Sequence, residues 1–199
     1  DTPNADPSRL HLNLQPKSLA GIDQCLAKFD SAVGQLKIRK NAVLAHEVLV
    51  TGSPEHMATL NRKQQIEYFK SAQSYLTELH GGNQNLVSMS VHLDESNPHC
   101  HFIFTPVIDK KLNSRLIIGG HRNRMSELQS EFAEVVGSKH GFVRGVKNSK
   151  ATHRDLRDLK QLEVDNVKLR SEVEGLRSEV STLKNELENL SKRFIEPLI

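Results

Sequence analysis

Three histidines within ten residues form the densest group of potential metal ligands in the sequence. They are His92, His99 and His101, in the stretch HLDESNPHCH. Because side chains alternate between the two faces of a β-strand, His99 and His101 should share one face, about 7 Å apart along the strand. A turn through Pro98 brings His92 across from them. Three imidazoles that converge in this way are typical of a metal site with open positions for water or substrate oxygens.

Two acidic residues, Asp94 and Glu95, follow His92 directly and complete the candidate catalytic group. One of them could accept a hydrogen bond from an imidazole and fix its tautomer, while the other serves as a catalytic acid or base. A single histidine on a strand is usually structural, but three of them beside two acids and a turn proline are poorly explained in that way. The spacing leaves the reaction open, since three-histidine sites occur in hydrolases, oxygenases and transferases.

The elements that must position these residues follow from the hydrophobic periodicity. The predicted elements are a helix over 18–33, a strand over 42–51, a helix over 61–80, strands over 85–93 and 99–108, and a helix over 121–139. The five-residue link that contains Pro98 suits an antiparallel hairpin between the last two strands. This order predicts an α+β fold with an antiparallel sheet flanked by helices.

A strict heptad repeat begins at residue 159 and predicts a long C-terminal coiled-coil helix. The a positions hold Leu159, Asn166, Val173, Val180, Leu187 and Phe194, and leucine fills the d positions Leu162, Leu169, Leu176, Leu183 and Leu190. Val at a with Leu at d favours two parallel strands, and a single Asn at an a position fixes their register. We therefore expect a homodimer through residues 159–194; the alternative is a helix packed on its own domain. The predicted domains are 1–153, which holds the candidate metal site, and 154–199, for dimerisation.

The bulk composition excludes several classes of protein. No apolar run approaches the roughly 20 residues of a membrane helix, and the polar start carries no secretory pattern. The two cysteines, Cys25 and Cys100, form no Cys-x-x-Cys pair, which favours a reduced, cytoplasmic protein. The net charge of +3 is modest, but basic residues gather between 110 and 154. Such a cluster suits phosphate binding or, equally, a solvated surface.

The string His92-x-Asp-Glu-x-x-Pro-His99-x-His101 resembles the signature of the MobV group of plasmid mobilisation relaxases, also known as plasmid recombination (Pre/Mob) enzymes. These belong to the HUH endonucleases, named for a His-hydrophobic-His motif. The resemblance extends to Asp6-Pro7-Ser8-Arg9-x-His11-Leu12-Asn13 and to the stretches 38–44 and 140–145. It covers most of residues 4 to about 155, and so implies that the domain over 1–153 binds both metal and DNA.

The resemblance implies an HUH relaxase-like fold and a metal-dependent nicking of one strand of origin-of-transfer DNA, in single-stranded or hairpin form. It also implies that the three histidines hold Mn²⁺ or Mg²⁺, which polarises the scissile phosphate. A protein nucleophile then becomes joined to the 5′ end of the nicked strand. The residues expected to contact DNA are Arg9, His11, Asn13, Arg39, Lys40, Arg122, Arg124, Arg144, Lys147 and Lys150.

One feature departs from the family pattern. In MobV enzymes a nucleophilic histidine lies in a first motif shortly before the second, and we expect it upstream of Asp1. Tyr68 and Tyr75 lie on the helix predicted over 61–80, where core packing is their expected role, and His11 is a weaker substitute. Two other functions stay open: another HUH enzyme, such as a replication initiator or transposase, or a non-catalytic DNA-binding and dimerisation protein with a structural metal.

Overall fold

The computed structural model describes residues 5–19, 21–147, 149 and 156–194 of the chain. The chain divides into two compact units, residues 1–147 and residues 148–199. Each unit is described by itself.

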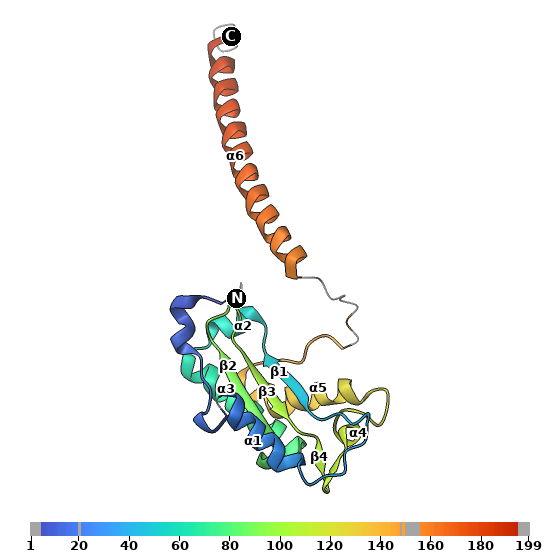
Figure 1. The fold of residues 1–199 in the computed structure, drawn as a ribbon. Helices are drawn as coiled ribbons and strands as arrows, with labels where there is room; N and C mark the ends of the chain where they lie inside the picture. Colours follow the sequence, from blue (N-terminus) through green and yellow to red (C-terminus); the bar gives the residue numbers. More distant parts are fainter. Residues whose placement is uncertain (1–4, 20, 148, 150–155, 195–199) are drawn as a thin grey trace. The chain divides into compact units, whose positions relative to one another are not determined.

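The first unit is built around a three-stranded antiparallel sheet in which β3 lies between β1 and β2 (Figure 1). The strands are β1 (His46–Thr51), β2 (Leu86–His92) and β3 (His99–Phe104). On β3, His99 lies opposite His92 of β2 on one side and opposite Thr51 of β1 on the other. The predicted hairpin between the last two strands is therefore confirmed. A small second sheet pairs β4 (Val107–Ile108) with β5 (Lys111–Leu112).

The core lies on one face of the sheet, where side chains of several helices enclose it. The described α-helices of this unit are α1 (Ile22–Val33), α2 (Pro54–Thr59), α3 (Arg62–Leu79), α4 (Ser114–Ile118) and α5 (Arg124–Val135). Short 3-10 turns are η1 (Pro7–Leu12), η2 (Lys17–Leu19), η3 (Asn83–Asn85) and η4 (Gly137–His140). Alternate residues of β3, among them Cys100 and Phe102, join Phe69 and Leu76 of α3 in one buried cluster. The opposite face of β3 carries His99 and His101, which are only half-buried.

Helix α3 supplies much of this core and is fixed at its first residue by a capping box. The Asn61 side chain accepts from the backbone N–H of Gln64 at 3.0 Å, and the Gln64 side chain accepts from the backbone N–H of Asn61 at 2.9 Å. The two tyrosines of α3 lie inside the protein, as expected. Burial raises the pKa of both Tyr68 and Tyr75 to about 12. The Tyr68 hydroxyl donates to the backbone carbonyl of Thr51.

The predicted α+β fold, with an antiparallel sheet flanked by helices and a long C-terminal helix, is confirmed. Some boundaries were wrong. The run over 99–108 is not one strand, because Pro106 lacks the N–H that a continuing ladder requires, and β4 starts only at Val107. Strand β1 starts at His46 rather than at residue 42, and the short helices α2 and α4 were not predicted.

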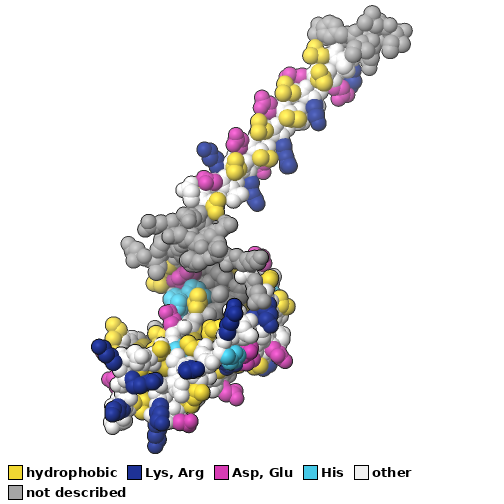
Figure 2. Space-filling model, turned by 90° about the vertical axis from the view of Figure 1, so that its right-hand side faces the viewer, with side chains coloured by type: hydrophobic (Ala, Val, Ile, Leu, Met, Phe, Trp, Pro, Cys, Tyr) yellow, Lys and Arg dark blue, Asp and Glu magenta, His cyan; other side chains and the backbone are white. Residues whose placement is uncertain are grey.

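The second unit contains the 39-residue helix α6 (Leu156–Phe194). Its heptad side chains are exposed, with Val173, Leu176 and Leu183 each about half exposed. Figure 2 shows hydrophobic side chains in a continuous row along α6, with acidic and basic side chains beside it. The side chains of Leu159 and Phe194, and the predicted boundary between 153 and 154, lie outside the described residues. Within the described parts of the chain, no helix combines the length and apolar character that crossing a bilayer requires.

Replacing Asn61 with Ala removes the capping box and should lower the free energy of unfolding by about 1 kcal/mol. Lys63→Ala, on the same exposed first turn of α3, is the control and should change it by less than about 0.5 kcal/mol. Urea titration monitored by circular dichroism measures both. Equal effects of the two substitutions would show that the cap does not stabilise the helix.

Candidate metal centre

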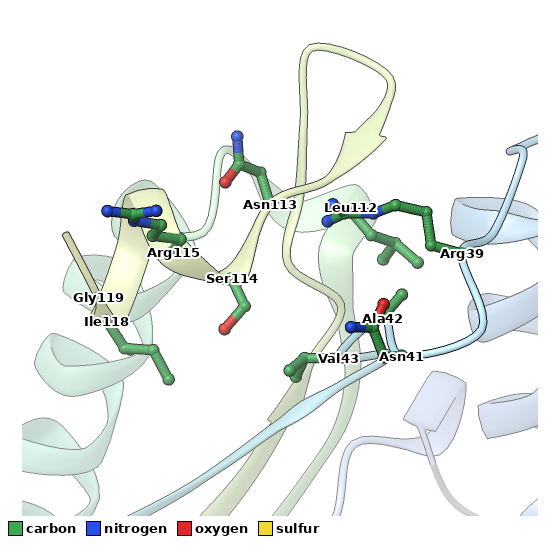
Figure 3. A pocket seen from close by; sticks show the side chains of 10 residues that line it. All are labelled: Arg39, Asn41, Ala42, Val43, Leu112, Asn113, Ser114, Arg115, Ile118 and Gly119. Atoms are coloured by element: carbon green, nitrogen blue, oxygen red, sulfur yellow. The ribbon is translucent and has the colours of Figure 1, made fainter.

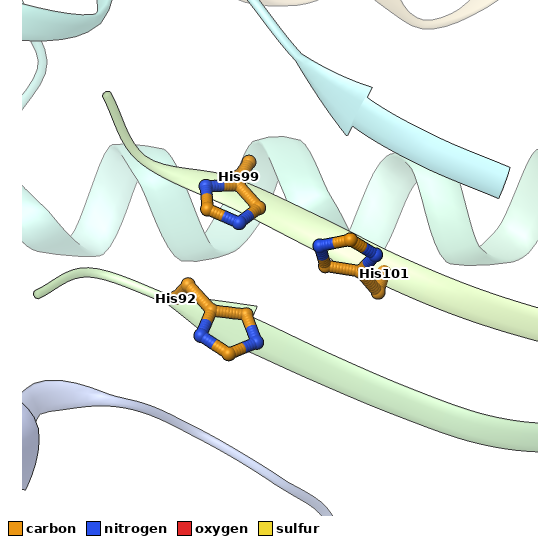
Figure 4. A group of neighbouring side chains, drawn as sticks. All are labelled: His92, His99 and His101. Atoms are coloured by element: carbon orange, nitrogen blue, oxygen red, sulfur yellow. The ribbon is translucent and has the colours of Figure 1, made fainter. Parts of the chain in front are cut away.

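His92, His99 and His101 converge on the face of the sheet opposite the core (Figure 4). One ring nitrogen from each lies within 4.8 Å of the corresponding atoms of the other two, close enough for all three to hold one metal ion. The rings of His92 and His99 are stacked with centroids 5.0 Å apart, and His101 is nearly perpendicular to both. The three imidazoles are half-buried, so solvent and a substrate have access to the group.

Strand alternation and strand pairing together create this cluster. His99 and His101 are two residues apart on β3 and point to the same side, while Cys100 between them is fully buried. Burial raises the pKa of the Cys100 thiol to about 12, so the sulfur stays protonated and is unsuited to binding metal. The antiparallel register then places His92 directly opposite His99.

Hydrogen bonds fix the tautomers of the two β3 histidines. The Nδ1–H of His101 donates to a carboxylate oxygen of Glu47 at 2.9 Å, and the Nδ1–H of His99 donates to the backbone carbonyl of Asn97 at 3.0 Å. In the neutral form of each ring, Nε2 is then the acceptor. This arrangement, in which a carboxylate or carbonyl orients an imidazole, is typical of metal-binding histidines.

The surroundings of His92 favour its neutral form. Burial, followed by the neighbouring imidazoles of His99 and His101, lowers its pKa, and this outweighs the opposite influence of nearby carboxylates. A neutral imidazole has the lone pair that metal binding needs. The Nε2 atom of His92 also lies 3.2 Å from the Ser90 hydroxyl.

The two predicted acidic residues have different environments. Asp94 is only 3% exposed; its Oδ1 lies 3.9 Å from Nδ1 of His92 and makes no hydrogen bond in the described structure. A buried carboxylate oxygen without a partner, beside a ring nitrogen, suits an acceptor that orients His92 once the imidazole binds a metal. Glu95 is half-buried and nearer to solvent. The donor set and its surroundings thus fit a divalent ion.

The segment before α1 holds the loop that carries these acids. The side-chain oxygen of Asn13 accepts from the backbone N–H groups of Leu93 and Asp94, at 2.8 and 3.2 Å. Arg9 donates to the backbone carbonyl of Leu93, and the N–H of Asp6 donates to the carbonyl of Asp94. Both Arg9 and Asn13, expected to contact DNA, are thus placed where they position the loop after His92.

The other predicted DNA contacts fall into two groups. Arg124 is paired with Glu131 at 2.9 Å and also donates to a backbone carbonyl, and Arg144 donates to the side chains of Ser126 and Ser130. These two guanidinium groups are largely occupied within the protein. The exposed members of the predicted set are His11, Arg39, Lys40, Arg122 and Lys147. Lys150 lies outside the described residues.

Sequence reasoning missed Glu47, which orients His101 from a different strand. Its position in the alternating stretch HEVLVT predicts an exposed side chain on β1, but only the register of β1 against β3 brings it beside His101. It also missed the buried pair His46 and His80, whose ring nitrogens lie 3.1 Å apart. Nothing local in the sequence indicates that pairing.

The chain matches the sequence profile described as plasmid recombination enzyme over residues 1–161. A plasmid recombination enzyme of Streptococcus agalactiae is 31% identical over 175 residues, which are 84% of this chain and 34% of that protein. A 65 kDa protein of Zymomonas mobilis is 34% identical over 160 residues, 77% of this chain and 27% of that protein. The chain therefore spans about a third of the length of these curated relatives.

Solved structures of the MobM relaxase domain (MOBV; Mob_Pre), bound to plasmid pMV158 oriT DNA, are similar to this chain. The Mn-bound crystal structure at pH 6.8 is 30% identical, with a TM-score of 0.64 over 81% of this chain and 84% of that one. The Mn-bound structure at pH 5.5 gives a TM-score of 0.65 at the same identity. At this identity the likeness extends beyond the general fold.

Removing Glu47 should weaken metal binding without abolishing it. Because Glu47 orients His101 and does not belong to the ligand triad, Glu47→Ala should lower Mn²⁺ affinity by about 10- to 100-fold.

The double variant His99→Ala/His101→Ala should lose stoichiometric Mn²⁺ uptake while keeping its circular dichroism spectrum. Isothermal titration calorimetry measures both, with Glu55→Ala on α2 as an exposed-carboxylate control. Unchanged metal content in the double variant would refute the assignment of the site.

Proposed function

This chain belongs to the plasmid recombination enzyme family, and we propose that it carries the metal-binding and DNA-binding part of a plasmid mobilisation relaxase. Such a protein nicks one strand of origin-of-transfer DNA, in single-stranded or hairpin form, by transesterification. The observation that carries this proposal is the convergence of His92, His99 and His101 on the accessible face of the sheet. The likeness to relaxase domains bound to oriT DNA supports it.

In this proposal the three histidines hold Mn²⁺ or Mg²⁺ through their ring nitrogens. A divalent ion bound there supplies a Lewis acid that draws charge from the oxygens of the scissile phosphate. Glu47 and the carbonyl of Asn97 hold the β3 imidazoles in the required tautomer. Asp94 is buried beside His92, and its carboxylate is the proposed acceptor that orients the His92 imidazole.

The proposed reaction joins a protein nucleophile to the 5′ phosphate of the nicked strand. A bond from the nucleophile to phosphorus forms as the bond to the 3′ oxygen breaks, and the nucleophile must lose a proton while the leaving oxygen gains one. Glu95, more accessible than Asp94, is the residue proposed to transfer that proton. Tyr68 is unsuited as the nucleophile, because it is buried and its hydroxyl donates to Thr51. The family resemblance assigns this role to a histidine that precedes the segment Asp6–Asn13.

DNA binding is proposed to use the exposed cations of the first unit, among them Arg39, Lys40 and Arg122. Each phosphate contact contributes through counterion release, so affinity should depend on salt. Arg9 and Asn13 contribute by holding the loop after His92 in place, because their side chains are bonded to it.

We propose further that the chain dimerises through α6, as a parallel coiled coil over residues 159–194. The described d-position leucines are all about half exposed or more, and a row of exposed leucines along one helix face favours burial against a second copy. Residues 1–153 would then form the metal and DNA-binding domain and residues 154–199 the dimerisation helix.

The nicking activity is tested on a supercoiled plasmid that carries the cognate origin of transfer, with the full-length gene product. We expect relaxed DNA and a covalent adduct at the 5′ end in the presence of Mn²⁺, and neither after treatment with EDTA. Glu95→Gln should slow nicking by about 10²- to 10⁴-fold, because the proton transfer is lost. Its Mn²⁺ affinity should stay close to that of the unaltered protein.

The control for that substitution is Glu78→Gln, an exposed carboxylate on α3, which should nick at the unaltered rate. Strand cleavage and adduct formation are read on denaturing gels. DNA binding without any cleavage in Mn²⁺ would contradict the proposed reaction and favour the non-catalytic DNA-binding protein with a structural metal.

The dimer is tested by placing a charge in the row of leucines. Leu176→Glu, at a d position, should convert a dimer into a monomer at micromolar concentration, because the carboxylate cannot be buried without a partner. Ser178→Glu adds the same charge two residues further on, at an f position outside the seam, and should stay dimeric. Analytical ultracentrifugation distinguishes the two. A monomeric unaltered chain at micromolar concentration would refute the coiled-coil dimer.

A further inference from the structure

A cavity of about 260 Å³ lies next to the start of β1 (Figure 3). None of the three histidines lines it. Its wall on one side is the segment that leads into β1, with Arg39, Asn41 and Val43, and on the other the segment around Ser114 and Arg115 at the start of α4. We call this cavity the Ser114 pocket. Among the residues that line it, two are arginines and none is acidic.

A chain of hydrogen bonds leads from this pocket into the core. The Ser114 hydroxyl lies 2.8 Å from Nε2 of His46, and Nδ1 of His46 lies 3.1 Å from Nε2 of His80. The Nδ1 of His80 lies 2.8 Å from the backbone carbonyl of Leu76. Two histidines thus connect the pocket to the end of α3.

The direction of each hydrogen bond in this series follows from the final acceptor, the backbone carbonyl of Leu76. A carbonyl only accepts, so Nδ1 of His80 must carry a proton and donate to Leu76. Burial lowers the pKa of His80 to about 4 and also lowers that of His46, so both rings are neutral. The Nε2 of His80 then accepts from Nδ1–H of His46, and Nε2 of His46 accepts from the Ser114 hydroxyl.

This direction determines what Ser114 presents to the pocket. The single proton of its hydroxyl is donated inward to His46, so Oγ has only lone pairs left for a ligand. The pocket therefore combines an acceptor that recognises an N–H group with two guanidinium groups that attract an anion. Neither Arg39 nor Arg115 forms an ion pair within the described residues. Val43 and other apolar side chains add a surface on which a flat ring can pack.

The position of the pocket relates it to the metal centre. On β1, His46 is three residues from Leu49, which lies opposite His101. Three residues of strand correspond to about 10 Å along β1. His46 faces the core side of β1, whereas Glu47 faces His101 on the other side, so a DNA strand that joins the two sites would pass around the edge strand β1.

We propose that the Ser114 pocket binds one unpaired nucleotide of the DNA strand. Its phosphate lies against Arg39 and Arg115, and an exocyclic amino group of its base, as in adenine or cytosine, donates to Oγ of Ser114. The pocket thereby selects the base at one position near the scissile phosphate. This proposal rests on the proposed function, because it assumes that the protein binds a DNA strand.

The test compares oligonucleotides that differ only in the amino group. Decamers of deoxyadenosine and of deoxynebularine, its analogue without the 6-amino group, form one pair. Decamers of deoxycytidine and of its analogue without the 4-amino group form the other. Fluorescence anisotropy with the full chain should show that, in at least one pair, the amino-bearing decamer binds about three- to tenfold more tightly, the contribution of one hydrogen bond.

Substitutions in the pocket should remove this preference. Ser114→Ala removes the acceptor, and Ala42→Phe fills the pocket while leaving the chain of hydrogen bonds intact. Both should bring the two members of the pair to equal affinity. The matched controls Ser74→Ala on α3 and Ala58→Phe on α2 should retain the preference. Arg115→Ala should weaken binding of every decamer more than Lys63→Ala, which removes the same charge outside the pocket.

Four other outcomes have distinct meanings. Equal binding of both pairs by the unaltered chain, or a preference that survives Ala42→Phe, would overturn the proposal. Free dAMP that binds as tightly as the decamer would also overturn it, since the pocket would then serve a free nucleotide. Failure of every decamer to bind at low salt would instead contradict the proposed function.

Discussion

The antiparallel pairing of β2 with β3 is the interaction on which the candidate site depends. It places His92 opposite His99 and leaves His101 on the same face, while Cys100 enters the core. Because side chains alternate, a slip of one residue would bury the histidines and expose the core residues of β3. The large free-energy cost of exposing residues such as Phe102 therefore also fixes the positions of the imidazoles. Stability and site geometry are set by the same register.

Two groups of histidines in this unit have opposite hydrogen-bonding states. In the first group, His99 and His101 donate one proton each to protein acceptors and keep one lone pair unused. In the second, the ring nitrogens of His46 and His80 are all within hydrogen-bonding distance of protein atoms. A histidine with a free lone pair in an accessible cluster can serve as a metal ligand. A histidine whose two ring nitrogens are both hydrogen-bonded instead fixes the direction of its neighbour's hydrogen bond, as His46 does for Ser114. The hydrogen bonds of the ring nitrogens therefore distinguish candidate metal ligands from structural histidines, which residue type alone does not.

The parts of the structure that local patterns encode were predictable from the sequence. The helix over 61–80, the strands around His92 and His99, and the heptads of the C-terminal helix all depend on patterns over a few residues, where periodicity and turn chemistry decide the outcome. The convergence of three histidines needed only strand alternation and a hairpin. Helix α4 was missed because five residues are too few for a periodic signal.

The contacts that support the site were not predictable, because they join distant parts of the chain. Glu47 and His101 are 54 residues apart, Ser114 and His46 are 68 apart, and Arg9 and Leu93 are 84 apart. No local spacing encodes such pairs; they follow from the order and register of the strands. The same reason explains Arg124 and Arg144, whose basic character predicted DNA contact but whose guanidinium groups are bonded to other parts of the protein.

The use of these arginines within the protein bears on how DNA would be recognised. A protein that relied on charge alone would need many unpaired cations, yet the net charge is only +3 and three of the predicted contacts, Arg9, Arg124 and Arg144, are internally bonded. Non-specific affinity from counterion release is then modest, because it grows with the number of phosphates neutralised. Discrimination would have to come from local geometry: a phosphate placed at the histidines, and a base edge presented to a group whose hydrogen-bonding direction is fixed, such as Ser114. A few well-oriented polar groups beside an apolar surface supply specificity that a diffuse positive surface cannot.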